Sequence, residues 1–146
     1  MDSKWTLKGE AAKIDIYVSG YERPAAENQS DANWLRCKGT VLIGRFSCSG
    51  DYSMMTSEFA EFEKTLKAGI ERLSGVVSFS TIEGGLGWDI EFNSRGQATI
   101  SGFVKSVGSP KAELRFSFQS DQSYLQQTLS ELVTVNRQFP IRAAQA

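Results

Sequence analysis

The sequence predicts an α+β fold in which one large antiparallel sheet of about seven to eight strands packs its apolar face against two helices. Along most of the chain apolar residues alternate with polar ones, which is typical of half-buried strands. Two segments, 56–74 and 122–136, instead repeat apolar residues every three or four positions, as amphipathic helices do. The 146 residues, 40% hydrophobic and 23% charged, fit one globular domain over 1–146.

The first two strands are expected around Trp5–Leu7 and Ile14–Val18, where each apolar residue is followed by a polar one. A polar loop over 20–32 follows them.

The next two strands form a predicted hairpin. A two-residue turn at Gly44-Arg45 places Ile43 opposite Phe46 and Val41 opposite Cys48, so that their apolar residues share one face. The same register sets Cys37 and Cys48 roughly 13 Å apart, beyond the reach of a disulfide. We therefore expect two free, buried thiols.

The first long helix is expected over 56–74, with Thr56 as its N-cap and Gly75 at its end. Its buried stripe is expected to consist of Phe59, Phe62, Leu66, Ile70 and Leu73.

A strand at Val77–Phe79 leads through the glycines of 84–87 into a three-stranded meander. The turn 94–96 has a glycine where a three-residue hairpin needs a left-handed residue. This turn, the apolar pattern and the charges predict the cross-strand pairs Asn93–Gln97, Phe92–Ala98, Ile90–Ile100, Val104–Leu114 and Lys105–Glu113.

The last helix is expected over 122–136, with Asp121 as its N-cap and Pro140 after its end. Its inward side is expected to consist of Tyr124, Leu125, Leu129, Leu132 and Val135.

The composition disfavours an enzyme. The chain has no histidine, the commonest general base and a common metal ligand, and no Gly-x-Ser-x-Gly motif. Neither cysteine has a histidine to activate it, and both stand at apolar strand positions. The glycines of 84–87 precede a strand and not a helix, so they indicate a turn and not a phosphate loop. We expect no catalytic residue, no metal and no cofactor.

Asp89 and Glu91 project from the polar face of one predicted strand, about 7 Å apart by strand rise. Such a pair could hydrolyse a glycoside only inside a cleft, and a solvated strand face is the favoured interpretation.

Basic residues beside an aromatic one, Arg36, Lys38 and Arg45 with Trp34, resemble an RNA-binding surface. The net charge of −1 and the pI near 5.5 favour no direct nucleic acid binding. Phe103 is the one large apolar residue predicted on the outer sheet face. It is either covered by a terminus or part of a contact patch.

The N-terminal residues Met1–Trp5 lack the apolar run of a secretory signal, and no apolar stretch is long enough to span a bilayer. We therefore expect a cytoplasmic protein with no membrane partner.

Several motifs, in order along nearly the whole chain, resemble those of the WapI-type bacterial immunity proteins. Gly20-Tyr21-Glu22-Arg23-Pro24 is similar to the "GYE-x-P" turn of that family, and Asp31-Ala32-Asn33-Trp34-Leu35 to its "D-x-NWL" strand. Thr56-Ser57-Glu58 is similar to its helix start, and a strand ending near Glu83 leads into a similar Leu-rich meander.

The resemblance implies a small cytosolic protein without chemistry of its own, which binds and occludes a cognate toxin domain. The namesake's toxin attacks tRNA, so the toxin here could be a nuclease. Because an acidic patch could meet the basic cleft of a nuclease, we expect Asp15, Asp89 and Glu91, on one sheet face, to contact the partner. The alternative is a small-ligand or adaptor binding module on the same scaffold.

Overall fold

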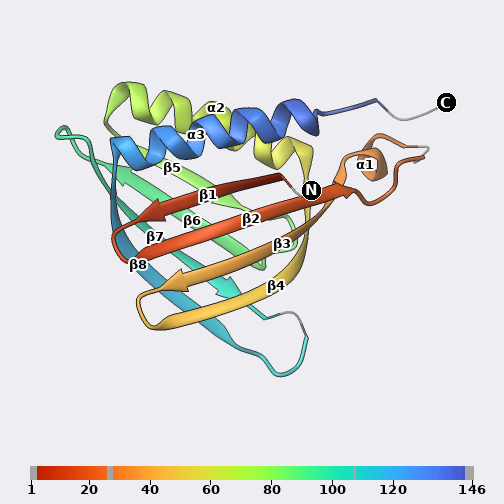
Figure 1. Ribbon diagram of the computed structural model, residues 1–146, viewed down its shortest axis with the longest axis horizontal. Helices are drawn as coiled ribbons and strands as arrows, with labels where there is room; N and C mark the ends of the chain where they lie inside the picture. Colours follow the sequence, from red (N-terminus) through yellow and green to blue (C-terminus); the bar gives the residue numbers. More distant parts are fainter. Residues whose placement is uncertain (1–2, 26–27, 107, 144–146) are drawn as a thin grey trace.

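The computed structural model describes residues 3–25, 28–106 and 108–143, and its eight strands form two four-stranded antiparallel sheets (Figure 1). Sheet A consists, in spatial order, of β1 (Ser3–Gly9), β2 (Ala12–Tyr21), β3 (Trp34–Ile43) and β4 (Phe46–Met55). Sheet B consists of β5 (Val76–Ser80), β6 (Leu86–Phe92), β7 (Gln97–Lys105) and β8 (Glu113–Asp121). The helices are α1 (Gln29–Ala32), α2 (Thr56–Arg72) and α3 (Gln122–Gln138).

The α+β class is confirmed, but the expectation of one large sheet is wrong. Helix α2 follows β4, the last strand of sheet A, and precedes β5, the first strand of sheet B, so it connects the two sheets. The alternation of apolar and polar residues within a strand indicates which face of that strand is buried. It does not indicate which strands share a sheet. The sheets lie one in front of the other, and their strands cross in the view of Figure 1.

The two long helices lie side by side along one side of the sheets (Figure 1). Helix α3 packs along β1 and helix α2 along β5, the first strand of each sheet. The helices therefore close one side and leave the outer faces of both sheets to solvent.

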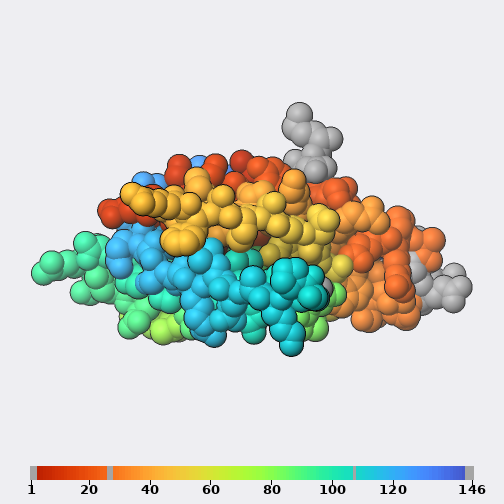
Figure 2. Space-filling view, turned by 90° about the horizontal axis from the view of Figure 1, so that it is seen from below, coloured from red at the N-terminus to blue at the C-terminus, as the bar shows by residue number. Residues whose placement is uncertain are grey.

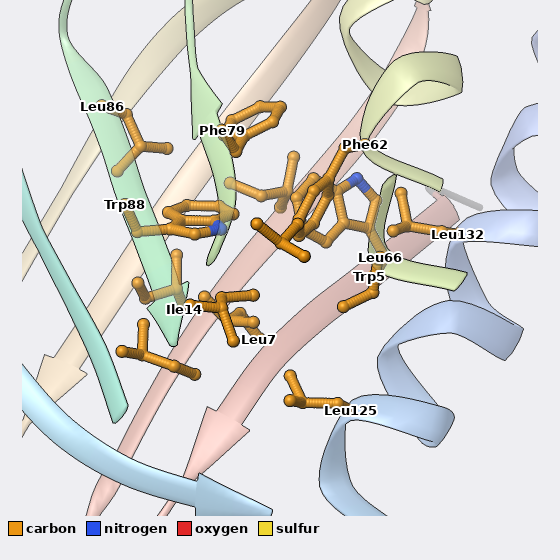
Figure 3. Packing of buried hydrophobic residues seen from close by; sticks show 14 of the residues in the cluster. Trp5, Leu7, Ile14, Phe62, Leu66, Phe79, Leu86, Trp88, Leu125 and Leu132 are labelled. Atoms are coloured by element: carbon orange, nitrogen blue, oxygen red, sulfur yellow. The ribbon is translucent and has the colours of Figure 1, made fainter. Parts of the chain in front are cut away.

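An aromatic cluster joins the inner faces of the sheets to α2 (Figure 3). Trp5 of sheet A is fully buried, with its ring centroid 5.5 Å from that of Phe59 and 5.9 Å from that of Trp88. Phe79 stacks on Trp88 at 4.7 Å, and Phe62 lies against both. Burying rings of this size supplies the largest apolar contribution to the core.

The predicted cross-strand registers are confirmed. The turn at Gly44-Arg45 pairs Ile43 with Phe46, and the meander contains every predicted pair, including Lys105–Glu113, whose charged atoms are 3.5 Å apart. Apolar alternation and turn length together determine register, because a shift of one residue would turn the apolar face to solvent.

The N-cap of α2 is Met55 and not Thr56. The Glu58 carboxylate accepts a hydrogen bond of 2.7 Å from the Met55 backbone N–H, while the Thr56 hydroxyl donates to the Asn33 side chain, 2.7 Å away. At the other end the helix closes at Leu73, which takes a left-handed conformation with φ of 49°. The Asp121 cap of α3 is confirmed: its carboxylate accepts from the Tyr124 N–H at 2.9 Å.

The expected stripes on the two long helices face the core. On α2 the first four stripe residues are buried and Leu73 is partly buried. On α3 Leu125, Leu132 and Val135 are buried, whereas Tyr124 and Leu129 are partly exposed.

The two motifs between Gly20 and Leu35 hold Arg142, shortly after α3, in place. Arg142 stacks its guanidinium on the Tyr21 ring at 4.0 Å and donates to the carbonyls of Ala32, Pro24 and Arg23. The predicted loop contains the short helix α1, capped by the Asn28 side chain. These motifs therefore have structural roles here.

The two cysteines are free, but only Cys37 is buried, so the expectation of two buried thiols is wrong for Cys48. Cys48 faces inward from β4, the edge strand of sheet A, where Phe46 is 64% exposed. Here an open cleft separates Cys48 from sheet B, so the apolar pattern continues beyond the closely packed core.

We expect a maleimide to label Cys48 in the native protein and Cys37 only after unfolding. Burial raises the pKa of Cys37 to about 12, and burial also raises the pKa of Cys48. Since the thiolate is the nucleophile, labelling of Cys48 should be slower than that of a free cysteine at neutral pH and should accelerate as the pH rises. Mass spectrometry of the labelled protein measures this, and Cys48→Ser should abolish native labelling. Two labels per native chain would contradict the placement of Cys37.

Candidate functional site

The outer face of sheet B is an open surface of mostly short polar side chains. Residues at alternate positions of its four strands point away from the core and are exposed or partly exposed, apart from Gly87. Across the strands they form the rows Val76–Glu91–Thr99–Gln119, Ser78–Asp89–Ser101–Ser117 and Ser80–Gly87–Phe103–Arg115, followed by the pair Lys105–Glu113.

The half of this face on β5 and β6 is acidic. Asp89 and Glu91 are both exposed on β6, and the Ser78 hydroxyl donates to the Asp89 carboxylate at 2.5 Å. Glu61 of α2 extends the acidic half, since it lines a depression together with Ser78 and others beside β5. Val76, 59% exposed, lies opposite Glu91 in the register. An exposed apolar side chain thus lies directly beside a carboxylate in the acidic half.

The half on β7 and β8 carries charges of both signs. Glu113 accepts from Arg115 at 2.6 Å and lies 3.5 Å from the Lys105 ammonium. Lys105 also lies over the Phe103 ring, 5.1 Å from its centroid. Phe103 is half-buried because it lies flat over Gly87, where a Cβ would be 3.0 Å from the ring. Gly87 and Lys105 therefore cover part of the Phe103 ring.

A shallow depression of about 480 Å³ lies between the two halves. Its lining includes Ser80, Asp89, Ser101, Phe103 and Arg115. The side chains in the middle of the face are small, so a longer side chain from a partner has room to enter between the acidic and basic groups.

Asp15 does not share this face. It lies on β2 of sheet A and is 3% exposed, whereas Asp89 and Glu91 are on β6 of sheet B. Its carboxylate accepts from the hydroxyls of Thr6 and Thr40 and lies 3.6 Å from the Lys13 ammonium. The structure therefore brings together two of the three expected residues and separates the third, because the predicted single sheet is two sheets.

Sequence reasoning missed Val76, Ser78 and Glu61 as members of this surface. The sequence did indicate an unusual position at Val76. Val77 and Phe79 are buried at alternate positions, so an apolar residue at 76 lies on the outer face, where a polar residue is expected. No sequence pattern indicated that Glu61 would lie beside β5.

The described residues include no metal-binding cluster. Within the ranges 3–25, 28–106 and 108–143, no group of three or more histidine, cysteine or acidic side chains is placed to hold a metal. Burial raises the pKa of Glu58, yet both of its oxygens accept backbone N–H bonds, from Met55 and Ile82. Its role is to join α2 to the loop before β6. In the same described part of the chain, no helix is both long and apolar enough to cross a membrane.

A separate apolar cleft of about 400 Å³ lies between β4 and the ends of β7 and β8. Its lining includes Tyr52, Val104 and Leu114, with Asp51 and Glu113 among the charged residues. Figure 2 shows the molecule from this side, with β4 in yellow above β7 and β8 in cyan to blue.

The family model of the WapI-like immunity proteins matches residues 6–140, nearly the whole chain. The chain belongs to the WapI-like immunity protein family. A search of curated proteins finds no match to it. The part of this WapI-like protein that the family model matches begins within β1 and includes α2, α3 and all of sheet B. Membership therefore applies to the two-sheet fold as a whole and not to a single motif.

Proposed function

We propose that this protein is a cytoplasmic bacterial immunity protein that binds and occludes a cognate toxin domain without catalysing a reaction. The family match over residues 6–140 is the observation that carries the proposal. An antidote of this kind needs a surface that is open, rigid and complementary to its target, and it needs no catalytic group.

The outer face of sheet B fits this requirement. Protein interfaces combine exposed apolar or aromatic groups with a polar rim. Val76 and Phe103 supply the apolar groups on this face, and Asp89, Glu91 and Arg115 supply the charged ones. Because these residues stand on paired strands, they keep their spacing when a partner binds.

The acidic half of the face favours a toxin with a basic active site, such as a nuclease. A nuclease must attract a polyanion, so its cleft is positively charged. Asp89, Glu91 and the nearby Glu61 could occupy that cleft and accelerate association by charge attraction.

Capture from a native lysate tests the proposal. The tagged protein should recover one large protein of secreted type, or its C-terminal fragment, at near-equal stoichiometry by mass spectrometry. The isolated fragment should be toxic, and the purified protein should inhibit it. Recovery of a metabolic enzyme, or of nothing, would contradict the proposal.

The apolar cleft between β4, β7 and β8 favours one alternative, a small-ligand binding module. Its volume of about 400 Å³ lies within the range of ligand pockets. A small molecule that copurifies with the protein and is lost from a Tyr52→Ala variant would support this alternative.

A further inference from the structure

We propose that the outer face of sheet A is a second docking surface, which binds an acidic segment of a partner protein that also carries an apolar side chain. This proposal does not depend on the proposed function, because it concerns the sheet face remote from Asp89 and Glu91.

The outer face of sheet A is rich in exposed cations. Outward positions of its strands carry two acidic residues, Asp15 and Asp51. Only Asp51 is exposed, since Asp15 is 3% exposed. The exposed cations are Lys4, Lys8, Lys13, Arg36 and Lys38.

These cations are only partly neutralised within the chain. The ammonium groups of Lys4 and Lys13 lie 4.0 and 3.6 Å from the single carboxylate of Asp15. Among the described residues, no ion pair involves Lys8, Arg36 or Lys38. The face therefore carries excess positive charge that an acidic partner would neutralise.

Lys8 and Lys13 lie directly opposite each other in the β1–β2 ladder. Like charges at such positions destabilise a sheet. Carboxylates of a bound partner, placed between the two ammonium groups, would turn this repulsion into attraction.

An apolar contact lies beside the cations. Leu42, 44% exposed, pairs with Lys13 across the β2–β3 ladder. Both line a depression of about 430 Å³ together with Thr40, Ser47 and Ser49. A single aliphatic side chain fits against Leu42 while neighbouring carboxylates reach Lys13 and Lys8.

The composition of the face favours a protein partner over a nucleic acid. Single-stranded nucleic acids bind where exposed aromatic rings stack on the bases. The outward positions of sheet A that the structure describes carry two aromatic residues, Tyr17 and Trp34, and neither is exposed. Both rings are partly buried, and the Lys4 ammonium lies 5.7 Å from the centroid of the Tyr17 ring.

Fluorescence anisotropy tests the proposal with three labelled probes: an acidic peptide with a central leucine, the same peptide with alanine in place of leucine, and oligouridylate. The full-length protein should bind the leucine peptide saturably, more tightly at low salt, and more tightly than the alanine peptide or oligouridylate. Lys8→Glu/Lys13→Glu should weaken binding about tenfold or more, and Leu42→Ser several-fold.

The matched control is Lys64→Glu/Lys67→Glu, which makes the same charge change on the exposed side of α2. Since Lys13→Glu places a carboxylate near Asp15, Lys8→Gln/Lys13→Gln serves as a second variant, and thermal unfolding checks that each variant is folded. The proposal is overturned if the control weakens binding equally, if the peptide does not bind, or if oligouridylate binds more tightly.

Discussion

Asn33→Ala is expected to lower the free energy of unfolding by about 2–4 kcal/mol. Asn33 is 3% exposed, and its side chain makes four hydrogen bonds to three separate segments. Its oxygen accepts from the Thr56 hydroxyl at 2.7 Å and the Arg142 N–H at 2.9 Å. Its amide donates to the carbonyls of Gln29 at 2.8 Å and Arg142 at 2.9 Å.

The loss is large because alanine leaves the buried partners unsatisfied and also releases the segment after α3. Urea denaturation measures the change. Asn28→Ala is the matched control: Asn28 is exposed and caps only the short helix α1, so its loss should cost about 1 kcal/mol or less. Equal effects of the two substitutions would show that Asn33 does not join these segments.

The double charge reversal Asp89→Lys/Glu91→Lys is expected to slow association with the toxin domain by about tenfold or more at low salt. It should also flatten the dependence of the association rate on salt. Both carboxylates are exposed on one face of β6, so the reversal replaces attraction to a basic cleft with repulsion. Stopped-flow or surface-based kinetics at several salt concentrations measures the rate.

Glu10→Lys/Glu71→Lys makes the same change in net charge at exposed positions outside this face. This control should alter the association rate less than the reversal on β6. An unchanged association rate in the Asp89→Lys/Glu91→Lys variant would rule the outer face of sheet B out as the binding surface.

Local structure could be predicted from the sequence because it depends on neighbouring residues. The pairing of Ile43 with Phe46 follows from a two-residue turn and the alternation on either side of it. The pairing of Lys105 with Glu113 follows from the apolar pattern and from charge attraction across the ladder. Neither prediction required knowledge of distant contacts.

The arrangement of the two sheets could not be predicted in this way, since hairpins with the same alternation can join one sheet or two. Asp15 illustrates the consequence for the site. The sequence placed it correctly on the polar side of its strand, but Thr6, Thr40 and Lys13 cover it in the folded protein. Cys48 illustrates the converse, because it has the pattern of a buried residue but is exposed on β4, the edge strand of sheet A.

The most direct test of the central claim is growth of cells that express the toxin domain recovered by capture, with and without this protein. The wild-type protein should restore growth, and the Asp89→Lys/Glu91→Lys variant should restore it less well than the Glu10→Lys/Glu71→Lys control at equal expression. Cells that die equally with and without the wild-type protein would contradict its role as the antidote.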